Sequence, residues 1–202
     1  RNNSIMKIWN QSSKDKNSAI DDFLSSEDIV LDQELFLYDI EASIAHAHEL
    51  ENINILAKSE TKKVIVSLKK LAKLFLAKKF KLTSKYEDCH TAIEDYLTRE
   101  LGSVGKKIHT GRSRNDQVMV AMRLYGRAKL DEIQSLNLKI AQSFFDKAEK
   151  HSSDPMPGYT HLQRAMPSTW GLWFGAFAES FLDNADLLSS TQTWMNINPL
   201  GS

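Results

Sequence analysis

Two short polar segments carry residue types that could do chemistry, and the first lies at residues 107–117. It reads KIHTGRSRNDQ, so that Arg112 and Arg114 flank a serine beside a glycine and an amide. A guanidinium group can grip a carboxylate through two parallel hydrogen bonds. A helix that begins here would add unpaired backbone N–H groups and a partial positive charge. The segment predicts a site for a polyanionic small molecule; the alternative is a helix N-cap with solvated arginines.

The second polar segment, residues 157–167, reads PGYTHLQRAMP. A proline-stiffened loop that presents Thr160, His161 and Gln163 suits acid–base chemistry, because histidine titrates nearest physiological pH. The alternative is a histidine that only hydrogen-bonds within the loop. We find no Cys/His spacing typical of zinc, no glycine-rich phosphate loop and no Ser-His-Asp order. By themselves these residues indicate an anion-binding helical enzyme without a metal.

The elements that must position these segments are predicted to be helices. The chain has only 8 Gly and 4 Pro in 202 residues, and its apolar residues recur at intervals of three and four. Ser84 and Glu87 have the spacing of a capping box ahead of a stripe formed by Ile93, Leu97 and Leu101. We therefore expect an all-α fold with a Pro/Gly-rich loop at 152–167 and helices at about 35–56, 64–75, 84–101, 115–150 and 168–194, the last capped by Ser168.

The helix predicted at 115–150 is unusually long. At 1.5 Å per residue its apolar face extends over about 50 Å, and propensity alone does not stabilise such a helix. This length favours a helical bundle, within one chain or assembled between subunits. The aromatic stripe from Trp170 to Phe181 is then expected to be buried between helices, because an exposed patch of this kind promotes aggregation.

Charge is balanced in total but uneven along the chain. Lys+Arg and Asp+Glu are 26 each, which gives no general attraction to nucleic acid or anionic lipid. Ten acidic residues and no Lys or Arg fall between Ser18 and Ala57, and nine lysines without an acid fall between Thr61 and Tyr86. The lysine-rich stretch could bind a membrane or nucleic acid. We favour a solvated face beside its acidic neighbour in a helical hairpin.

Composition and the ends of the sequence bear on location. Cys89 is the one cysteine, which excludes an intrachain disulfide and suits the reducing cytoplasm. The longest apolar stretch, residues 170–178, is too short to cross a bilayer. Residues 1–7 lack the apolar core of a signal peptide. We therefore expect a cytoplasmic protein.

The two polar segments, TGRSRNDQ and GYTHLQRAMP, together resemble the argininosuccinate lyase family and its lens-crystallin relatives, within the fumarase/aspartase superfamily. The resemblance covers nearly the whole chain. Further landmarks occur in the family's order, namely Lys7-Ile8-Trp9, YDIEASIAHA at 38–47, YEDCHTAIEDYL at 86–97 and NPLGS from Asn198.

The resemblance implies an all-α fold with a small N-terminal helical domain, residues 1–110, followed by the first part of a central long-helix bundle, residues 111–202. It also implies a homotetramer whose active sites are shared between subunits. The implied reaction is the reversible elimination of argininosuccinate to arginine and fumarate, a step of arginine biosynthesis, without metal or organic cofactor.

The resemblance also assigns roles residue by residue. It implies an acid/base role for one histidine and substrate contacts for two groups of polar residues, with two further candidates near the pocket. These residues are His161 as the catalytic acid/base; Ser113, Arg114, Asn115 and Thr160 as substrate-binding residues; and His90 and Gln163 as the further candidates.

The chain departs from the family pattern at two places. Asp28 stands where the family usually has a substrate-contacting serine, unless Ser25 or Ser26 serves instead. The family's loop with a catalytic serine, of GSSxMPxKxNP type, does not occur before Ser202, so we expect the 202-residue chain alone to be inactive. The rival hypotheses are a non-catalytic crystallin-like relative or assembly partner, and a superfamily lyase with another substrate.

Overall fold

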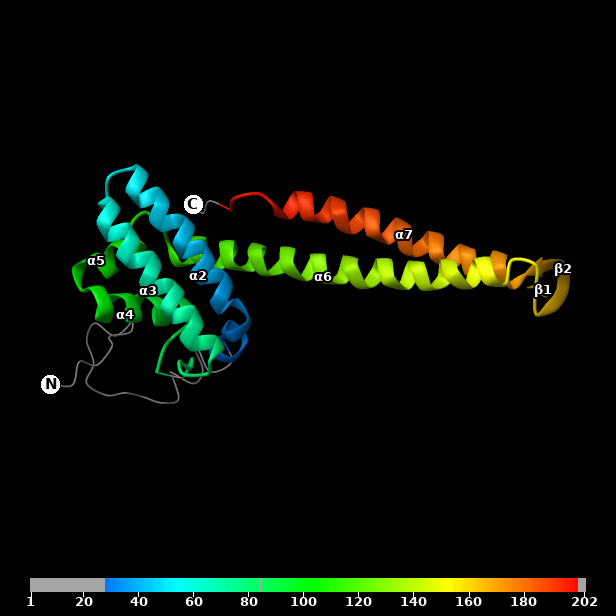
Figure 1. Cartoon of the computed structure of the whole chain (residues 1–202), viewed down its shortest axis with the longest axis horizontal. Helices are drawn as coiled ribbons and strands as arrows, with labels where there is room; N and C mark the ends of the chain where they lie inside the picture. The colour runs from blue at the N-terminus through cyan, green and yellow to red at the C-terminus, as the bar shows by residue number, and fades with distance from the viewer. Residues whose placement is uncertain (1–27, 84, 200–202) are drawn as a thin grey trace. The chain divides into compact units, whose positions relative to one another are not determined.

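The computed structural model describes residues 28–83 and 85–199 of the chain (Figure 1). The chain divides into two compact units, one within residues 1–125 together with 198–202, and one formed by residues 126–197. Each unit is described by itself below. The family resemblance implied a domain boundary between residues 110 and 111. That boundary stays a prediction.

The first unit is helical. Its elements are α2 (Asp28–Asn52), α3 (Lys58–Leu76), α4 (Cys89–Leu101), the short α5 (Ser103–Lys106), the 3-10 helix η1 (Lys107–His109) and the first turns of α6 (Arg114–Lys150). The predicted all-α fold is confirmed, and one two-stranded sheet is added in the second unit.

The core of the first unit lies between α2, α3 and α4, which pack against one another. Phe36 is fully buried, and its ring lies 4.4 Å from that of Phe75 and 5.6 Å from that of Phe80, centroid to centroid. Apolar residues that recur at helical intervals supply most of the remaining core, which includes Ile40, Leu50, Val64, Leu68, Leu71, Ile93 and Leu97. This core fixes α4, and through α4 the start of α6.

Several predicted helix boundaries are wrong. Helix α2 begins at Asp28 rather than near residue 35, and α3 begins at Lys58 rather than at residue 64. Two other boundaries have local reasons. The first helix ends at Asn52 rather than near residue 56, because Asn54 adopts a left-handed backbone with φ of 60° and the N–H groups of Ile55 and Leu56 fold back onto the Leu50 carbonyl. The third helix begins at Cys89, where the Asp88 carboxylate accepts a hydrogen bond from the Thr91 N–H at 2.6 Å. Ser84, the predicted cap, lies outside the described residues.

The second unit contains most of α6, a β-hairpin and α7 (Trp170–Met195). The hairpin joins β1 (Pro155–Thr160) to β2 (Gln163–Thr169) in antiparallel register, from Pro155 opposite Thr169 to Thr160 opposite Gln163. The prediction of a loop at residues 152–167 is therefore wrong over most of its length. Proline fixes φ at values that a strand also accepts, so prolines did not exclude strands here. The cap of α7 is Thr169 rather than Ser168, since the Thr169 Oγ1 accepts from the Leu172 N–H at 3.0 Å.

Helices α6 and α7 pack through aromatic rings. Phe144 of α6 stacks on Phe177 and Phe181 of α7, with ring centroids 5.3 and 5.8 Å apart. A pair of helices covers only one side of α7, so Trp170, Trp173 and Phe177 keep about two-fifths of their surface exposed, between 40% and 43%. The expected burial of the aromatic stripe between helices is therefore not achieved within this chain.

The lysine-rich stretch forms much of α3, which packs beside α2 as predicted. Lys70 of this helix pairs with Glu100 of α4 at 2.9 Å, and both side chains are exposed. Within residues 28–83 and 85–199, none of the helices combines the length and the apolar character that crossing a bilayer requires.

Two glycines of α7 provide a matched test of the packing in the second unit. A Cβ on Gly171 would lie 2.5 Å from Ser152 Cα and 2.7 Å from the Ala148 carbonyl oxygen, whereas Gly175 meets only Ala148 Cβ, at 4.0 Å. We expect Gly171→Ala to lower the free energy of unfolding by about 1–3 kcal/mol, because backbone atoms must move to make room for the new methyl group. Gly175→Ala should instead raise it by up to about 1 kcal/mol through helix propensity. Urea unfolding of both variants measures the difference, and equal stabilities would contradict the close approach of α7 to the end of α6.

Candidate functional site

The segment TGRSRNDQ opens α6 through a reciprocal cap. The Asp116 N–H donates to Ser113 Oγ at 3.3 Å, and the Ser113 N–H donates to Asp116 Oδ2 at 2.7 Å. Arg114 is the first residue of the helix, and Ser113 and Asn115 on either side of it are exposed. The helix-cap interpretation is thus correct for Ser113, and the cap leaves the side chain of Asn115 at the positive end of the helix.

Arg114 is not a solvated arginine, because its side chain is only 25% exposed and bound on three sides. Its Nε lies 3.2 Å from Asp88 Oδ2, Nη1 donates to Gln117 Oε1 at 2.9 Å, and Nη2 donates to Thr91 Oγ1 at 3.2 Å. Asp88 caps α4 and Thr91 lies in its first turn. The guanidinium group is therefore held in one orientation by α4.

Glu94 of α4 completes this cluster. Its Oε1 accepts from Gln117 Nε2 at 3.1 Å, pairs with His109 Nδ1 at 2.9 Å and lies 3.6 Å from Arg114 Nη1. Asp88, Thr91 and Glu94 were not among the candidates predicted from the sequence, although all three lie within the YEDCHTAIEDYL landmark. A helical spacing shows which residues share a face, but not that this face meets Arg114.

The loop before α6 is fastened to α2. His46 Nε2 bonds to the Thr110 carbonyl oxygen at 2.9 Å. Burial lowers the pKa of His46, and the charge of Arg112 lowers it further. The ring is therefore neutral at physiological pH and can donate its Nε2 hydrogen to that carbonyl. This bond ties the YDIEASIAHA landmark to TGRSRNDQ.

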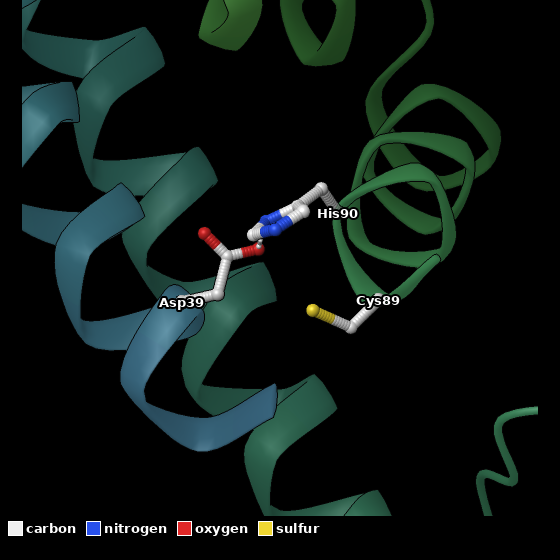
Figure 2. A group of neighbouring side chains, drawn as sticks. All are labelled: Asp39, Cys89 and His90. Carbon is white, nitrogen blue, oxygen red and sulfur yellow. Dashed lines mark hydrogen bonds and ion pairs between the residues drawn. The ribbon is translucent and has the colours of Figure 1, made fainter. Parts of the chain in front are cut away.

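His90 forms a buried pair with Asp39 of α2 (Figure 2). His90 Nδ1 and Asp39 Oδ2 are 2.7 Å apart, and both side chains are 1% exposed. Arg112 lies close enough for Asp39 and Glu94 to oppose the lowering of its pKa that burial causes. His90, a secondary candidate in the sequence, is thus placed between α2 and α4, within the helical core that carries the Arg114 cluster.

Asp39, Cys89 and His90 each place one ligand atom within 4.8 Å of the others, as the ligands of a metal ion would. Burial, reinforced by the charges of Asp39 and Asp32, raises the pKa of the Cys89 thiol, so the sulfur stays protonated and is a poor metal ligand. Two ligands at tetrahedral zinc distances are about 3.3 Å apart, wider than the 2.7 Å between Nδ1 and Oδ2. The geometry fits a hydrogen-bonded dyad beside a neutral thiol, not a cation site.

His161 occupies the tip of the hairpin in the second unit. His161 and Leu162 form the two-residue turn with φ of 49° and 63°, a left-handed conformation that glycine or asparagine normally supplies. Leu162 is 98% exposed, and Thr160, His161 and Gln163 are exposed too. A left-handed backbone at residues other than glycine is strained and is often found at functional sites. Here the turn leaves the His161 side chain exposed.

The described structure therefore groups the candidate residues in two sets. Ser113, Arg114, Asn115 and His90 belong to the first unit, and Thr160, His161 and Gln163 to the second. Asp28 is the first residue of α2, and Ser25 and Ser26 lie outside the described residues.

Curated relatives resemble the chain over almost all of its length. Argininosuccinate lyase of Xanthomonas euvesicatoria is 45% identical over 195 residues, which cover 96% of this chain and 45% of that protein. Argininosuccinate lyase of Xylella fastidiosa is 44% identical over 195 residues, which cover 96% of this chain and 44% of that protein. The chain therefore spans less than half the length of these relatives.

Solved structures share the fold. A variant of EDDS lyase with bound fumarate matches with a TM-score of 0.74 and 27% identity, covering 85% of this chain and 33% of that one. A fumarate lyase described as delta crystallin, from Brucella melitensis, matches with a TM-score of 0.68 and 18% identity over 81% of this chain and 41% of that one, a likeness of fold alone. A family model described as "Lyase" matches residues 3–202. The chain belongs to this lyase family, within the fumarase/aspartase superfamily.

Proposed function

We propose that this chain is part of an argininosuccinate lyase, which reversibly eliminates fumarate from argininosuccinate and releases arginine. The observation that carries the proposal is the 45% identity to an argininosuccinate lyase across 96% of the chain. The fixed Arg114 cluster and the outward-facing His161 are consistent with it.

The proposed chemistry needs three functions. A base removes a proton from the carbon beside a carboxylate, fixed donors stabilise the resulting aci-carboxylate, and an acid protonates the leaving guanidinium nitrogen. Ser113, Asn115 and the N–H groups at the start of α6 are the donors of the first unit, with Arg114 between them. His161 is the acid/base group, and Thr160 and Gln163 flank it in the hairpin.

We further propose a homotetramer whose active sites combine residues of different subunits. Arg114 begins α6 and the His161 hairpin follows its end, and a helix of 37 residues is about 55 Å long. Large apolar side chains on α6 and α7 are exposed in the single chain, among them Ile133, Leu136, Phe145, Leu172 and Leu187. Exposed apolar surface of this extent is typical of an interface.

The alternatives use the same fold. A superfamily lyase with another substrate would keep the acid/base histidine and the helical frame. A non-catalytic crystallin-like relative could keep both motifs. We also propose that the protein acts in arginine biosynthesis in the cytoplasm and that its reaction uses no cofactor.

The first experiment is a substrate panel on the protein expressed from its complete reading frame. We expect fumarate and arginine to form from argininosuccinate, and no comparable release of fumarate from adenylosuccinate or aspartate. Ultraviolet absorbance of fumarate gives the rate, and chromatography identifies the second product. Faster turnover of another substrate would support the alternative lyase, and no turnover of any would support the non-catalytic relative.

His161→Asn tests the acid/base assignment. Because the side chain is exposed at a turn, we expect the fold to be unchanged and kcat to fall by about 10²–10⁴-fold, the usual loss of a general acid or base. His48→Asn, on the exposed surface of α2, is the matched control and should keep the wild-type rate. A His161→Asn enzyme as fast as the control would refute the role of His161.

Arg114→Lys tests the arginine cluster and the shared site together. Lysine has one charged centre and cannot bind Asp88, Thr91 and Gln117 at once. We therefore expect kcat/KM to fall by about 10–100-fold, the equivalent of one or two charge-assisted hydrogen bonds. Arg127→Lys, at an exposed position of α6, is the control and should have little effect.

Mixed assemblies of Arg114→Lys and His161→Asn subunits then test the sharing of sites. If each site takes these residues from different subunits, some sites of a hybrid contain neither change, and activity returns on mixing. Hybrids whose activity only averages that of the two parents would show that both residues act within one subunit.

A further inference from the structure

Three buried polar atoms near TGRSRNDQ lack a hydrogen-bond partner among the described residues. They are Asp39 Oδ1, His90 Nε2 and Arg112 Nε. Buried polar atoms nearly always have partners, so a group of three needs an explanation. Asp39 connects them, because it bonds to His90 and interacts electrostatically with Arg112.

The Asp39–His90 bond determines which imidazole nitrogen is available. A carboxylate accepts a hydrogen, so Nδ1 carries a proton, and in the neutral ring Nε2 then presents its lone pair. The ring cannot exchange these roles through solvent, because both side chains are 1% exposed. Figure 2 shows Asp39 reaching from α2 to the His90 ring on α4, with Cys89 to one side.

The dyad is adjacent to the arginine cluster in the chain and in space. Asp88 and Thr91, on either side of the Cys89–His90 pair, both bind Arg114. Arg112, which interacts with Asp39, belongs to the same motif as Arg114. The dyad and the residues that hold Arg114 therefore share the start of α4.

We infer that Asp39 is a positioning residue of the lyase site: it fixes the orientation and the Nδ1–H tautomer of His90, so that Nε2 accepts a hydrogen bond or proton from the substrate. This inference rests on the proposed function. It adds a carboxylate, remote from both motifs in the sequence, that acts on the reaction through His90.

The kinetic test compares three variants of the protein expressed from its complete reading frame: Asp39→Asn, His90→Asn and the double variant. Asparagine keeps the size of Asp39 but can donate to Nδ1 and stabilise the wrong tautomer. We expect Asp39→Asn to lower kcat at least about tenfold, with KM and melting temperature little changed. Because Asp39 acts through His90, the double variant should be no slower than His90→Asn alone.

Cys89→Ala is the matched control, since Cys89 is buried in the same cluster but does not bond to His90. It should keep the wild-type kcat even if packing costs some stability. A purely structural dyad would instead lower the melting temperature of Asp39→Asn and leave kcat intact. That result, or kcat losses that multiply in the double variant, would overturn the inference.

A second measurement does not depend on turnover. Long-range proton–nitrogen correlation spectra of the chain labelled with ¹⁵N-histidine report the tautomer of each ring, and the His90→Asn spectrum identifies the signal of His90. We expect the Nδ1–H form in the wild type and its loss in Asp39→Asn. An Nε2–H form in the wild type would overturn the positioning role even if argininosuccinate is turned over, whereas failure of the substrate panel alone would overturn only the proposed function.

Discussion

The contact between the guanidinium group of Arg114 and the carboxylates of Asp88 and Glu94 is the interaction on which the rest of the site depends. A flexible arginine loses side-chain entropy when it binds a ligand. Here the chain has already fixed the group through α4, so that little further ordering is required. The two carboxylates also offset its charge, and their contacts with the guanidinium group orient the start of α6. In the function that we propose, the core of α2, α3 and α4 therefore contributes to the chemistry, because it determines where these carboxylates lie.

The second unit shows the opposite physical situation. Its hairpin places His161 in a left-handed backbone conformation at an exposed tip, and α6 and α7 leave large apolar side chains uncovered. Neither feature lowers the free energy of a chain in isolation. Both become reasonable if other copies cover these helices and contact the tip, as in the assembly that we propose. Stability and function would then be acquired in the same step.

Two neighbouring buried residues near TGRSRNDQ, Cys89 and His90, differ in their polar chemistry. Cys89 is a small apolar-like residue whose thiol is kept neutral by burial and by neighbouring carboxylates. The imidazole beside it is held by Asp39 through Nδ1, at 2.7 Å. Adjacent residues of one helix thus make different contacts with α2: Asp32 binds the backbone of Cys89, whereas Asp39 binds the side chain of His90. Asp32, which accepts from the Cys89 N–H at 2.8 Å, and Asp39 both approach from α2.

The sequence by itself determined the helical class, the approximate limits of the long helices and the family, because periodicity and contiguous motifs are local properties of the chain. Its motifs also indicated Ser113, Arg114 and His161 as candidate site residues. It did not determine the hairpin around His161, since proline-rich segments fit a loop and a strand equally well. Nor did it reveal that Asp88, Thr91 and Glu94 bind Arg114, or that Asp39 binds His90 across 51 residues of chain. Those pairings were decided by the packing of α2 against α4 and by where the start of α6 meets α4, and such contacts between distant segments leave no local pattern in the sequence.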